Sequence, residues 1–126
     1  SAFRDFGLTK LCVDSTGLGA FPAETMQKTY GKHFVEAVPF TLQSKNELAT
    51  TLYQVIAEKR VRLSRASVEL RDDIAMIRRV VTASGNVSYE ATRSDRGHAD
   101  RAWALALALY ARSGPDRRKH DLRTGF

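Results

Sequence analysis

The segment that most constrains the fold lies near the C-terminus, from about His98 to Arg112. It consists almost entirely of Ala, Leu, Trp and Tyr. A helix that is apolar on every face is usually buried, so we expect this one to lie centrally against a sheet. Its longest apolar run, from Ala102 to Ala111, is ten residues and is too short to span a bilayer. The segment therefore predicts the core helix of a soluble protein that does not enter a membrane.

The rest of the chain alternates between short apolar runs typical of strands and segments with helical spacing. In chain order the predicted elements are a strand over 8–13, a helix over 20–30, a strand over 34–40, a helix from 44 to about 60, a short strand over 61–63, a helix after Ser67, and a hairpin of strands 80–83 and 87–91. Strands that alternate with helices imply an α/β sheet with a parallel portion. We expect one domain over residues 1–112, followed by a basic, flexible tail over residues 113–126.

Local signals indicate where the helices and the hairpin turn begin. Ser44 and Glu47 have the spacing of a capping box, so we place a helix start at Ser44. Ser67 is predicted to cap the next helix, in which Ile77 faces inward. Gly85 can adopt the positive φ that a tight hairpin turn requires.

Composition indicates a single basic domain. The chain has 126 residues, with 20 Lys and Arg against 14 Asp and Glu, which gives a net charge of +6. Such a charge favours a polyanion such as nucleic acid, or an acidic membrane surface. Cys12 is the only cysteine, which excludes an intramolecular disulfide and argues against a structural zinc site. We expect Cys12 to pack as a small hydrophobe, in an intracellular, reducing setting.

Two aspartates stand where a metal site could form. Asp14 follows a predicted strand, and open α/β sheets bind ligands at the carboxyl ends of their strands. The alternative interpretation is that Asp14 caps the following turn, and periodicity alone favours this cap. Asp100 opens the last helix, where the helix dipole is a sufficient explanation for a carboxylate. Because Mg²⁺ is commonly held by one or two carboxylates and phosphate oxygens, the two aspartates form a metal-binding pair if strand end and helix start meet.

Other polar residues near Asp100 are candidates for contact with a nucleic acid. His98 is interpreted as a metal ligand, a proton-transfer group or a phosphate contact, with an ordinary helix-start histidine as an equal alternative. Arg93, Arg96 and Arg101 are predicted to contact DNA phosphates.

Other kinds of site find little support in the sequence. The turn at Gly17 and Gly19 lacks the third glycine of a dinucleotide-binding fingerprint, because Pro22 holds that place, and it lacks the lysine of a P-loop. We therefore interpret it as a tight turn between a strand and a helix. No serine stands in a G-x-S-x-G elbow, and Cys12 has no basic neighbour that would activate it.

Three stretches carry a resemblance to a known family. They are Val13-Asp14-Ser15-Thr16-Gly17-Leu18-Gly19, then Phe40-Thr41 with Lys45-Asn46-Glu47-Leu48, and Gly97-His98-Ala99-Asp100-Arg101-Ala102-Trp103-Ala104-Leu105-Ala106. Together they resemble the C-terminal half of bacteriophage terminase large subunits, most closely the Mu-like branch, from about Leu8 to Arg112.

The resemblance implies a ribonuclease H-like, α/β nuclease domain with a partly parallel mixed sheet flanked by helices. It implies that Asp14 and Asp100 bind two Mg²⁺ or Mn²⁺ ions, which hydrolyse phosphodiesters of concatemeric viral DNA. We take Asp14, Asp100 and His98 as the candidate catalytic residues. The implied partners are double-stranded DNA, an N-terminal ATPase domain, the portal protein and the small terminase subunit. The implied location is the cytoplasm of a bacterial host that carries the phage or prophage.

One departure from the family's pattern bears on activity. The family's first strand and its aspartate should precede Leu8, where only seven residues stand. We therefore expect the fold to lack its first strands, as in a fragment or a degenerate prophage product. On that interpretation the chain alone binds metal weakly and cuts DNA poorly or not at all. Two alternatives stay open: a non-catalytic DNA-binding or motor-docking module that retains the nuclease fold, and an α/β domain whose aspartates are only caps.

Overall fold

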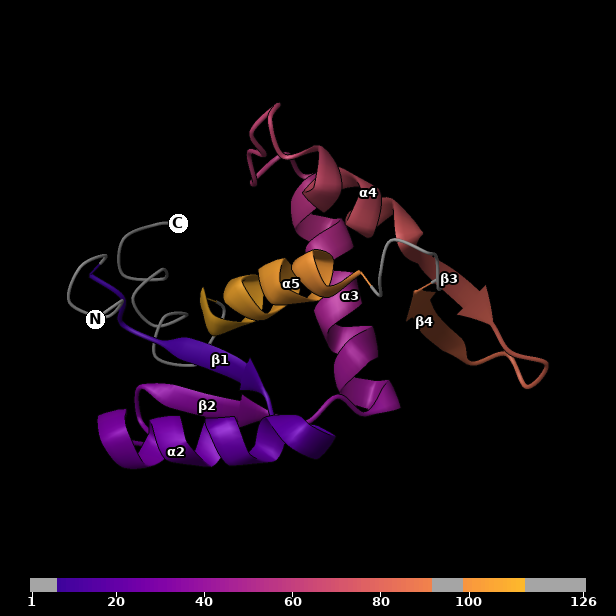
Figure 1. Ribbon diagram of the computed structural model, residues 1–126. Coiled ribbons are helices and arrows are strands. Elements are labelled where there is room, and N and C mark those ends of the chain that lie inside the picture. Colours follow the sequence, from indigo (N-terminus) through magenta and orange to yellow (C-terminus); the bar gives the residue numbers. More distant parts are fainter. Residues whose placement is uncertain (1–6, 92–98, 113–126) are drawn as a thin grey trace, which may run out of the picture. The chain divides into compact units, whose positions relative to one another are not determined.

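The computed structural model describes residues 7–91 and 99–112 (Figure 1). The structural features described below belong to these residues. The chain divides into two compact units, one of residues 1–40 and 107–126 and the other of residues 41–106. The first unit buries Val35 and Val38 from a strand, and the second buries Leu48 and Leu52 from a helix.

The first unit contains a strand–helix–strand motif. Its elements are β1 (Leu11–Asp14), the short 3-10 helix η1 (Gly17–Gly19), α2 (Ala20–Tyr30) and β2 (Val35–Val38). The two strands pair in parallel, with Leu11 opposite Val35 and Asp14 opposite Val38. The parallel portion predicted from the sequence is therefore confirmed.

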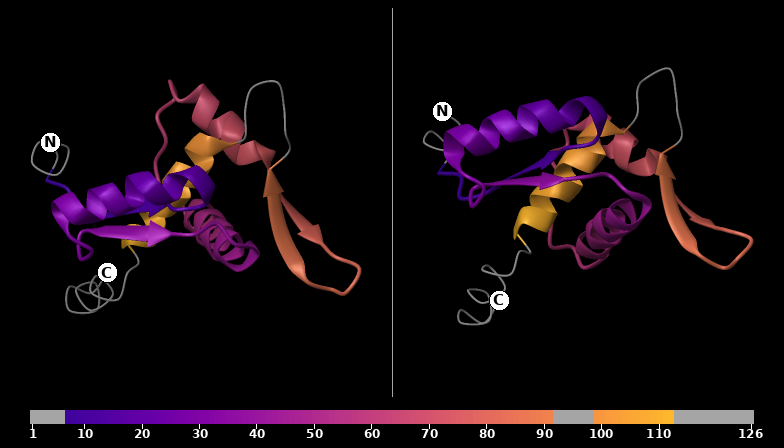
Figure 2. Two further views of the ribbon diagram at one scale, coloured as in Figure 1. Left: turned by 60° about the horizontal axis from the view of Figure 1, so that its bottom comes forward. Right: turned by 90° about the horizontal axis from the view of Figure 1, so that it is seen from below.

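Helix α2 lies alongside both strands and has the predicted bounds (Figures 1 and 2). It buries Ala23, and it ends at Gly31, whose φ of +90° favours glycine. Strand β1 is shorter than predicted, because β2 provides partners only from Val35 onward and the chain before β2 forms a turn. Leu8 is accordingly exposed.

The second unit contains helices and a hairpin. Its elements are α3 (Leu42–Ala57), α4 (Val68–Met76), β3 (Ile77–Val81), β4 (Val87–Ala91) and the first part of α5 (Asp100–Arg112). The described strands thus form two separate sheets, one parallel pair and one antiparallel pair, in place of the single mixed sheet that was expected.

Helix α3 begins three residues earlier than the predicted capping box. Thr41 is the N-cap: its hydroxyl oxygen accepts the Ser44 amide N–H at 3.1 Å, and the Ser44 hydroxyl oxygen accepts the Thr41 amide N–H at 2.9 Å. The prediction of a Ser44–Glu47 box was wrong, because Ser44 is the third helical residue and not the N-cap. Its hydroxyl group takes the place that Glu or Gln usually has in a capping box. The apolar face of the helix was correctly predicted, since Leu48 and Leu52 are buried.

Three further predictions for the second unit concern residues 61–63 and the two ends of α4. Residues 61–63 form no strand, because no neighbouring strand pairs with them. Ser67 is the N-cap of α4, but its side chain makes no capping bond. Ile77 is buried as predicted, yet it is the first residue of β3 rather than part of the helix.

The hairpin is an antiparallel ribbon with Ile77 opposite Ala91 and Val81 opposite Val87 (Figure 2). Its first strand starts three residues before the predicted Val80, and the connection runs from Thr82 to Asn86. Gly85 has the expected positive φ, at +85°.

Helix α3 holds the hairpin through side chains that substitute for a further strand. The Asn46 side-chain amide donates to the Val87 carbonyl at 2.7 Å and accepts the Tyr89 amide N–H at 3.1 Å. Tyr53 stacks on Tyr89 and its hydroxyl donates to the Ile77 carbonyl. The backbone of β4 therefore finds its outer hydrogen bonds on a helix.

Helix α5 is buried on one side only. Ala102, Trp103 and Ala106 are buried, whereas Ala104 and Ala108 are exposed. The prediction of burial on every face was wrong because the apolar residues on the outer face are alanines, which cost little to expose and favour a helix. None of the described helices is long and apolar enough to cross a membrane.

Candidate functional site

Asp14 is the last residue of β1 and stands at the carboxyl end of the parallel pair. Its Oδ1 accepts the Thr16 amide N–H at 2.9 Å, which closes a turn within three residues. Its Oδ2 has no hydrogen bond or ion pair to any residue that the structure describes. The capping interpretation of Asp14 is therefore confirmed for one oxygen, while the other oxygen is uncommitted.

The glycine turn after Asp14 has the structural role that the sequence suggested. Gly17 has a φ of +58° and starts η1, which leads directly into α2. The Thr16 hydroxyl oxygen accepts the Phe40 amide N–H, and the Ser15 amide N–H donates to the Val38 carbonyl at 3.0 Å. These bonds hold the carboxyl ends of both strands together beside Asp14.

Asp100 is the first helical residue of α5 and is exposed. No described residue makes a hydrogen bond or an ion pair with its carboxylate. The preceding residue, Ala99, is 1% exposed, and its carbonyl accepts the Trp103 amide N–H at 3.1 Å. Asp100 thus carries a carboxylate with no partner in the described part of the chain, next to the buried Ala99.

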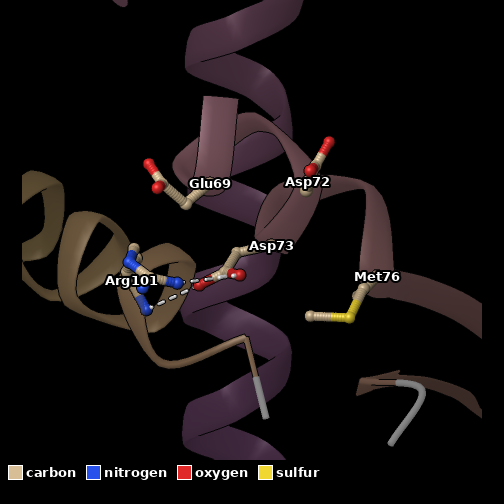
Figure 3. Close-up of a pocket in the computed structure, with 5 residues that line it drawn as sticks. All are labelled: Glu69, Asp72, Asp73, Met76 and Arg101. Atoms are coloured by element: carbon tan, nitrogen blue, oxygen red, sulfur yellow. Dashed lines mark hydrogen bonds and ion pairs between the residues drawn. The ribbon is translucent and has the colours of Figure 1, made fainter. Parts of the chain in front are cut away.

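Asp73 on α4 is the one acidic residue among the described residues that is buried, at 5% exposure, and the sequence analysis missed it. Its Oδ2 accepts the Arg101 amide N–H at 3.0 Å, and its Oδ1 lies 3.5 Å from Arg101 Nη1 (Figure 3). A signal was present in the sequence, because Asp73 lies between Leu70 and Ile74 on the apolar face of the helix. A carboxylate at such a position requires a partner.

An open pocket of about 440 Å³ lies beside this ion pair. Its lining residues are Glu69, Asp72, Asp73, Met76 and Arg101 (Figure 3). Although three of them are acidic, no group of three or more His, Cys, Asp or Glu side chains in the described part of the chain is placed to hold a metal ion. Asp73 is committed to Arg101, so we read the pocket as the surroundings of that ion pair.

The remaining predicted site residues divide into two groups. His98, Arg93 and Arg96 lie outside the described residues. Arg101 lies on α5 with its side chain 59% exposed, and its predicted contact with a DNA phosphate stays a prediction. Asp14 belongs to the first unit and Asp100 to the second. That the two carboxylates lie close together therefore stays a prediction.

A polar cluster around Glu36 occupies one side of the β1–β2 pair in the first unit. Lys10 Nζ lies 2.9 Å from Glu36 Oε2, and the Tyr110 hydroxyl donates to Oε1 at 3.2 Å. Burial alone would raise the pKa of Glu36, but the hydrogen bond and charge of Lys10, together with the hydrogen bonds from Tyr110 and Cys12, outweigh it and lower that pKa. The same hydrogen bond raises the pKa of Lys10.

Cys12 lies within the same cluster, with its Sγ 3.7 Å from Glu36 Oε2. Burial, together with the Glu36 charge, raises the pKa of the thiol from 9.0 to about 11. A thiol with such a pKa is protonated at neutral pH and is a poor nucleophile. Cys12 is half-buried beside a carboxylate, so its surroundings are polar and not those of the small hydrophobe that was expected.

Comparisons with known proteins identify the family but no individual relative. Residues 1–112 match the family described as the terminase RNaseH-like domain. No curated protein and no solved structure matches the chain. The match includes both the turn at Asp14 and the helix start at Asp100, the two places that carried the resemblance. This chain belongs to the terminase ribonuclease H-like domain family.

Proposed function

We propose that this chain is the metal-dependent endonuclease domain of a phage DNA-packaging terminase large subunit. The observation that carries the proposal is the family match over residues 1–112. The substrate is double-stranded viral DNA, whose phosphodiester bonds the domain hydrolyses. The net charge of +6 supports binding to such a polyanion.

The donor atoms at the two predicted metal ligands fit a hard divalent cation. Asp14 offers Oδ2 and Asp100 offers its carboxylate, in each case without a competing partner among the described residues. Mg²⁺ and Mn²⁺ prefer such oxygen ligands and retain positions for water and phosphate oxygens. When bound, these cations supply an activated water and offset the charge on the phosphate under attack.

The chain's own residues prepare this chemistry by fixing where the carboxylates stand. The bond from the Thr16 N–H restrains Asp14 Oδ1, and Oδ2 is the oxygen left to bind a cation. Asp100 lies in the first turn of α5, where the positive end of the helix dipole is a favourable neighbour for an acidic side chain. Arg101, together with Arg93 and Arg96, is proposed to contact DNA phosphates near the site.

The proposed biological setting follows from the same family. In a terminase large subunit the domain works with an ATPase domain, the portal protein and the small subunit, in the cytoplasm of a bacterial host. The Mu-like relationship, the presence of two metals and the role of His98 are parts of the proposal.

A plasmid-cleavage assay with added Mn²⁺ tests the proposal. We expect the wild-type chain to nick supercoiled DNA only with Mn²⁺ or Mg²⁺, at a low rate if a third carboxylate is required. Asp14→Asn and Asp100→Asn should each abolish this cleavage, because each removes a charged ligand and changes few atoms. Glu24→Gln, which removes an exposed carboxylate from α2, is the matched control and should cleave like wild type.

Two results would contradict the proposal. Cleavage that persists in Asp100→Asn would show that the metal ligands lie elsewhere. Salt-sensitive DNA binding with neither metal-dependent cleavage nor Mn²⁺ binding would favour the alternative of a non-catalytic DNA-binding or motor-docking module, which the +6 charge also supports.

A further inference from the structure

Among the described residues, no side chain next to the start of α5 caps this helix. Ala99 precedes the first helical residue, and its carbonyl accepts the first helical hydrogen bond, from the Trp103 N–H. An N-cap side chain normally accepts the N–H of the second or third helical residue, which a methyl group cannot do. Ala99 also has a φ of +61°, in the left-handed region that is costly for residues with a Cβ. The described residues adjacent to the helix start, Ala99 and Asp100, therefore do not explain why the helix starts here.

Asp73 provides the missing bond from another helix. Its Oδ2 accepts the N–H of Arg101, the second helical residue, at 3.0 Å (Figure 3). This is the bond that a local Asp or Asn cap would make, although Asp73 precedes Arg101 by 28 residues. Asp73 is 5% exposed, so water competes little for its carboxylate.

The Arg101 guanidinium group also forms an ion pair with Asp73. Arg101 Nη1 lies 3.5 Å from Asp73 Oδ1, and the positive charge offsets the negative charge of Asp73. The amide bond and the ion pair therefore both connect Asp73 to the second residue of α5.

We propose that Asp73 is a positioning residue for Asp100, acting as a long-range N-cap of α5. The inference rests on the proposed function, in which Asp100 binds a divalent metal. Asp100 lies between the buried, left-handed Ala99 and the Arg101 amide that Asp73 holds. These two restraints fix the backbone that carries the Asp100 carboxylate. Loss of a group that orients a metal ligand typically weakens metal binding by about 10–100-fold.

Variants at position 73 separate a capping role from a purely electrostatic one. Asp73→Asn keeps an oxygen that accepts the Arg101 N–H but removes the charge. Asp73→Glu keeps the charge but moves the carboxylate by one methylene group. Asp73→Ala removes both, and Asp72→Ala is the matched control, because it removes an exposed carboxylate from the neighbouring position. Each folded variant is titrated with Mn²⁺, and exchange of the Arg101 amide hydrogen is measured in parallel.

The capping role predicts a specific pattern. Asp73→Ala and Asp73→Glu should raise the Mn²⁺ dissociation constant about tenfold or more and speed exchange of the Arg101 amide. Asp73→Asn should stay within about threefold of wild type, since Asn and Asp are comparable N-caps. Asp72→Ala should bind Mn²⁺ like wild type. If Asp73→Ala does not fold, the opposite predictions for Asn and Glu still decide the matter.

The outcomes that overturn the inference are distinct from those that overturn the proposed function. Wild-type Mn²⁺ affinity in Asp73→Glu, or an Asn variant as weak as Ala, would show that Asp73 is not a cap for the metal ligand. If the wild-type chain itself binds no Mn²⁺, the proposed function fails and the positioning role fails with it. In that case amide exchange would still report on the cap as a structural feature.

Discussion

Asp14 serves the fold with one carboxylate oxygen and is available to a metal with the other. Its Oδ1 accepts the Thr16 N–H at 2.9 Å, whereas Oδ2 has no partner in the described part of the chain. The two interpretations that the sequence left open, a cap and a metal ligand, are therefore compatible in one side chain. They can be separated by substitutions that remove one role at a time.

Asp14→Asn should have nearly the same free energy of unfolding as wild type, because an amide oxygen can still accept the Thr16 N–H. Asp14→Ala should lower the free energy of unfolding by about 1 kcal/mol, the usual effect of losing such a bond. Chemical denaturation checks both values. Equal destabilisation by Asn and Ala would show that the charge of Asp14, and not the turn bond, supports the fold.

Cys12 offers a pH-dependent prediction at the same scale. Its pKa is raised from 9.0 to about 11 by burial and by Glu36, so ionisation of the thiol disfavours the folded state. The stabilising contribution is complete below pH 9 and is lost as the pH rises toward 11. Wild type should therefore lose stability between these pH values more steeply than Cys12→Ala.

Thiol alkylation provides the second measurement on Cys12. At pH 8 the folded chain should react at least about tenfold more slowly than the unfolded chain, because the thiolate fraction is smaller. Equal rates in the two states would contradict the raised pKa.

At the scale of elements, the ends of helices were harder to predict than their existence. Helix α2 has its predicted bounds because Gly31 supplies a local stop signal. The start of α3 was misplaced because Thr41 and Ser44 form the capping box, and Ser44 alone gave no indication of which role it plays. The start of α5 depends on Asp73, which comes from a distant part of the chain.

The end of α3 shows a further feature that side-chain pattern could not reveal. The Lys59 amide N–H donates to the Ile56 carbonyl, and the Arg60 amide N–H donates to the Val55 carbonyl, each at 3.0 Å. These are the two bonds of a Schellman motif, with Lys59 in the left-handed position at a φ of +57°.

Lys59→Gly should stabilise the chain by about 0.5–1 kcal/mol, because glycine adopts a positive φ without strain. Part of the gain is offset by the greater freedom of glycine in the unfolded chain. Lys59→Ala is the control: it removes the same charge and retains the Cβ, so it should not stabilise. Thermal or chemical unfolding measures the difference. A stabilising Lys59→Ala would mean that the charge, and not the backbone, is unfavourable.

At the scale of the whole molecule, the sequence predicted the α/β class, the parallel strands, the hairpin and the family. It placed Asp14 at a strand end and Asp100 at a helix start, and both positions are confirmed. It missed Asp73, because recognising a buried carboxylate requires knowing which helix start it reaches. Its prediction that Asp14 and Asp100 share a metal site depends on tertiary arrangement and stays a prediction.

The net charge of +6 leads to a prediction about DNA binding. Affinity for duplex DNA should fall with salt, and the slope of the log–log plot should be about −0.9 for each phosphate neutralised. Arg101→Ala should reduce that slope by about one unit if this exposed guanidinium contacts a phosphate. Fluorescence anisotropy at several salt concentrations gives the slopes. Absence of binding at low ionic strength would contradict the role of DNA as substrate.

The central claim is that Asp14 and Asp100 bind the same divalent metal cluster, and a double-mutant cycle of Mn²⁺ affinity tests it most directly. Binding is measured calorimetrically for wild type, Asp14→Asn, Asp100→Asn and the double variant. Each single variant should weaken Mn²⁺ binding strongly, and the double variant should lose much less than the sum of the two, because residues that act on one site are not additive. Fully additive losses, or wild-type affinity in either single variant, would show that the two aspartates do not share a metal site.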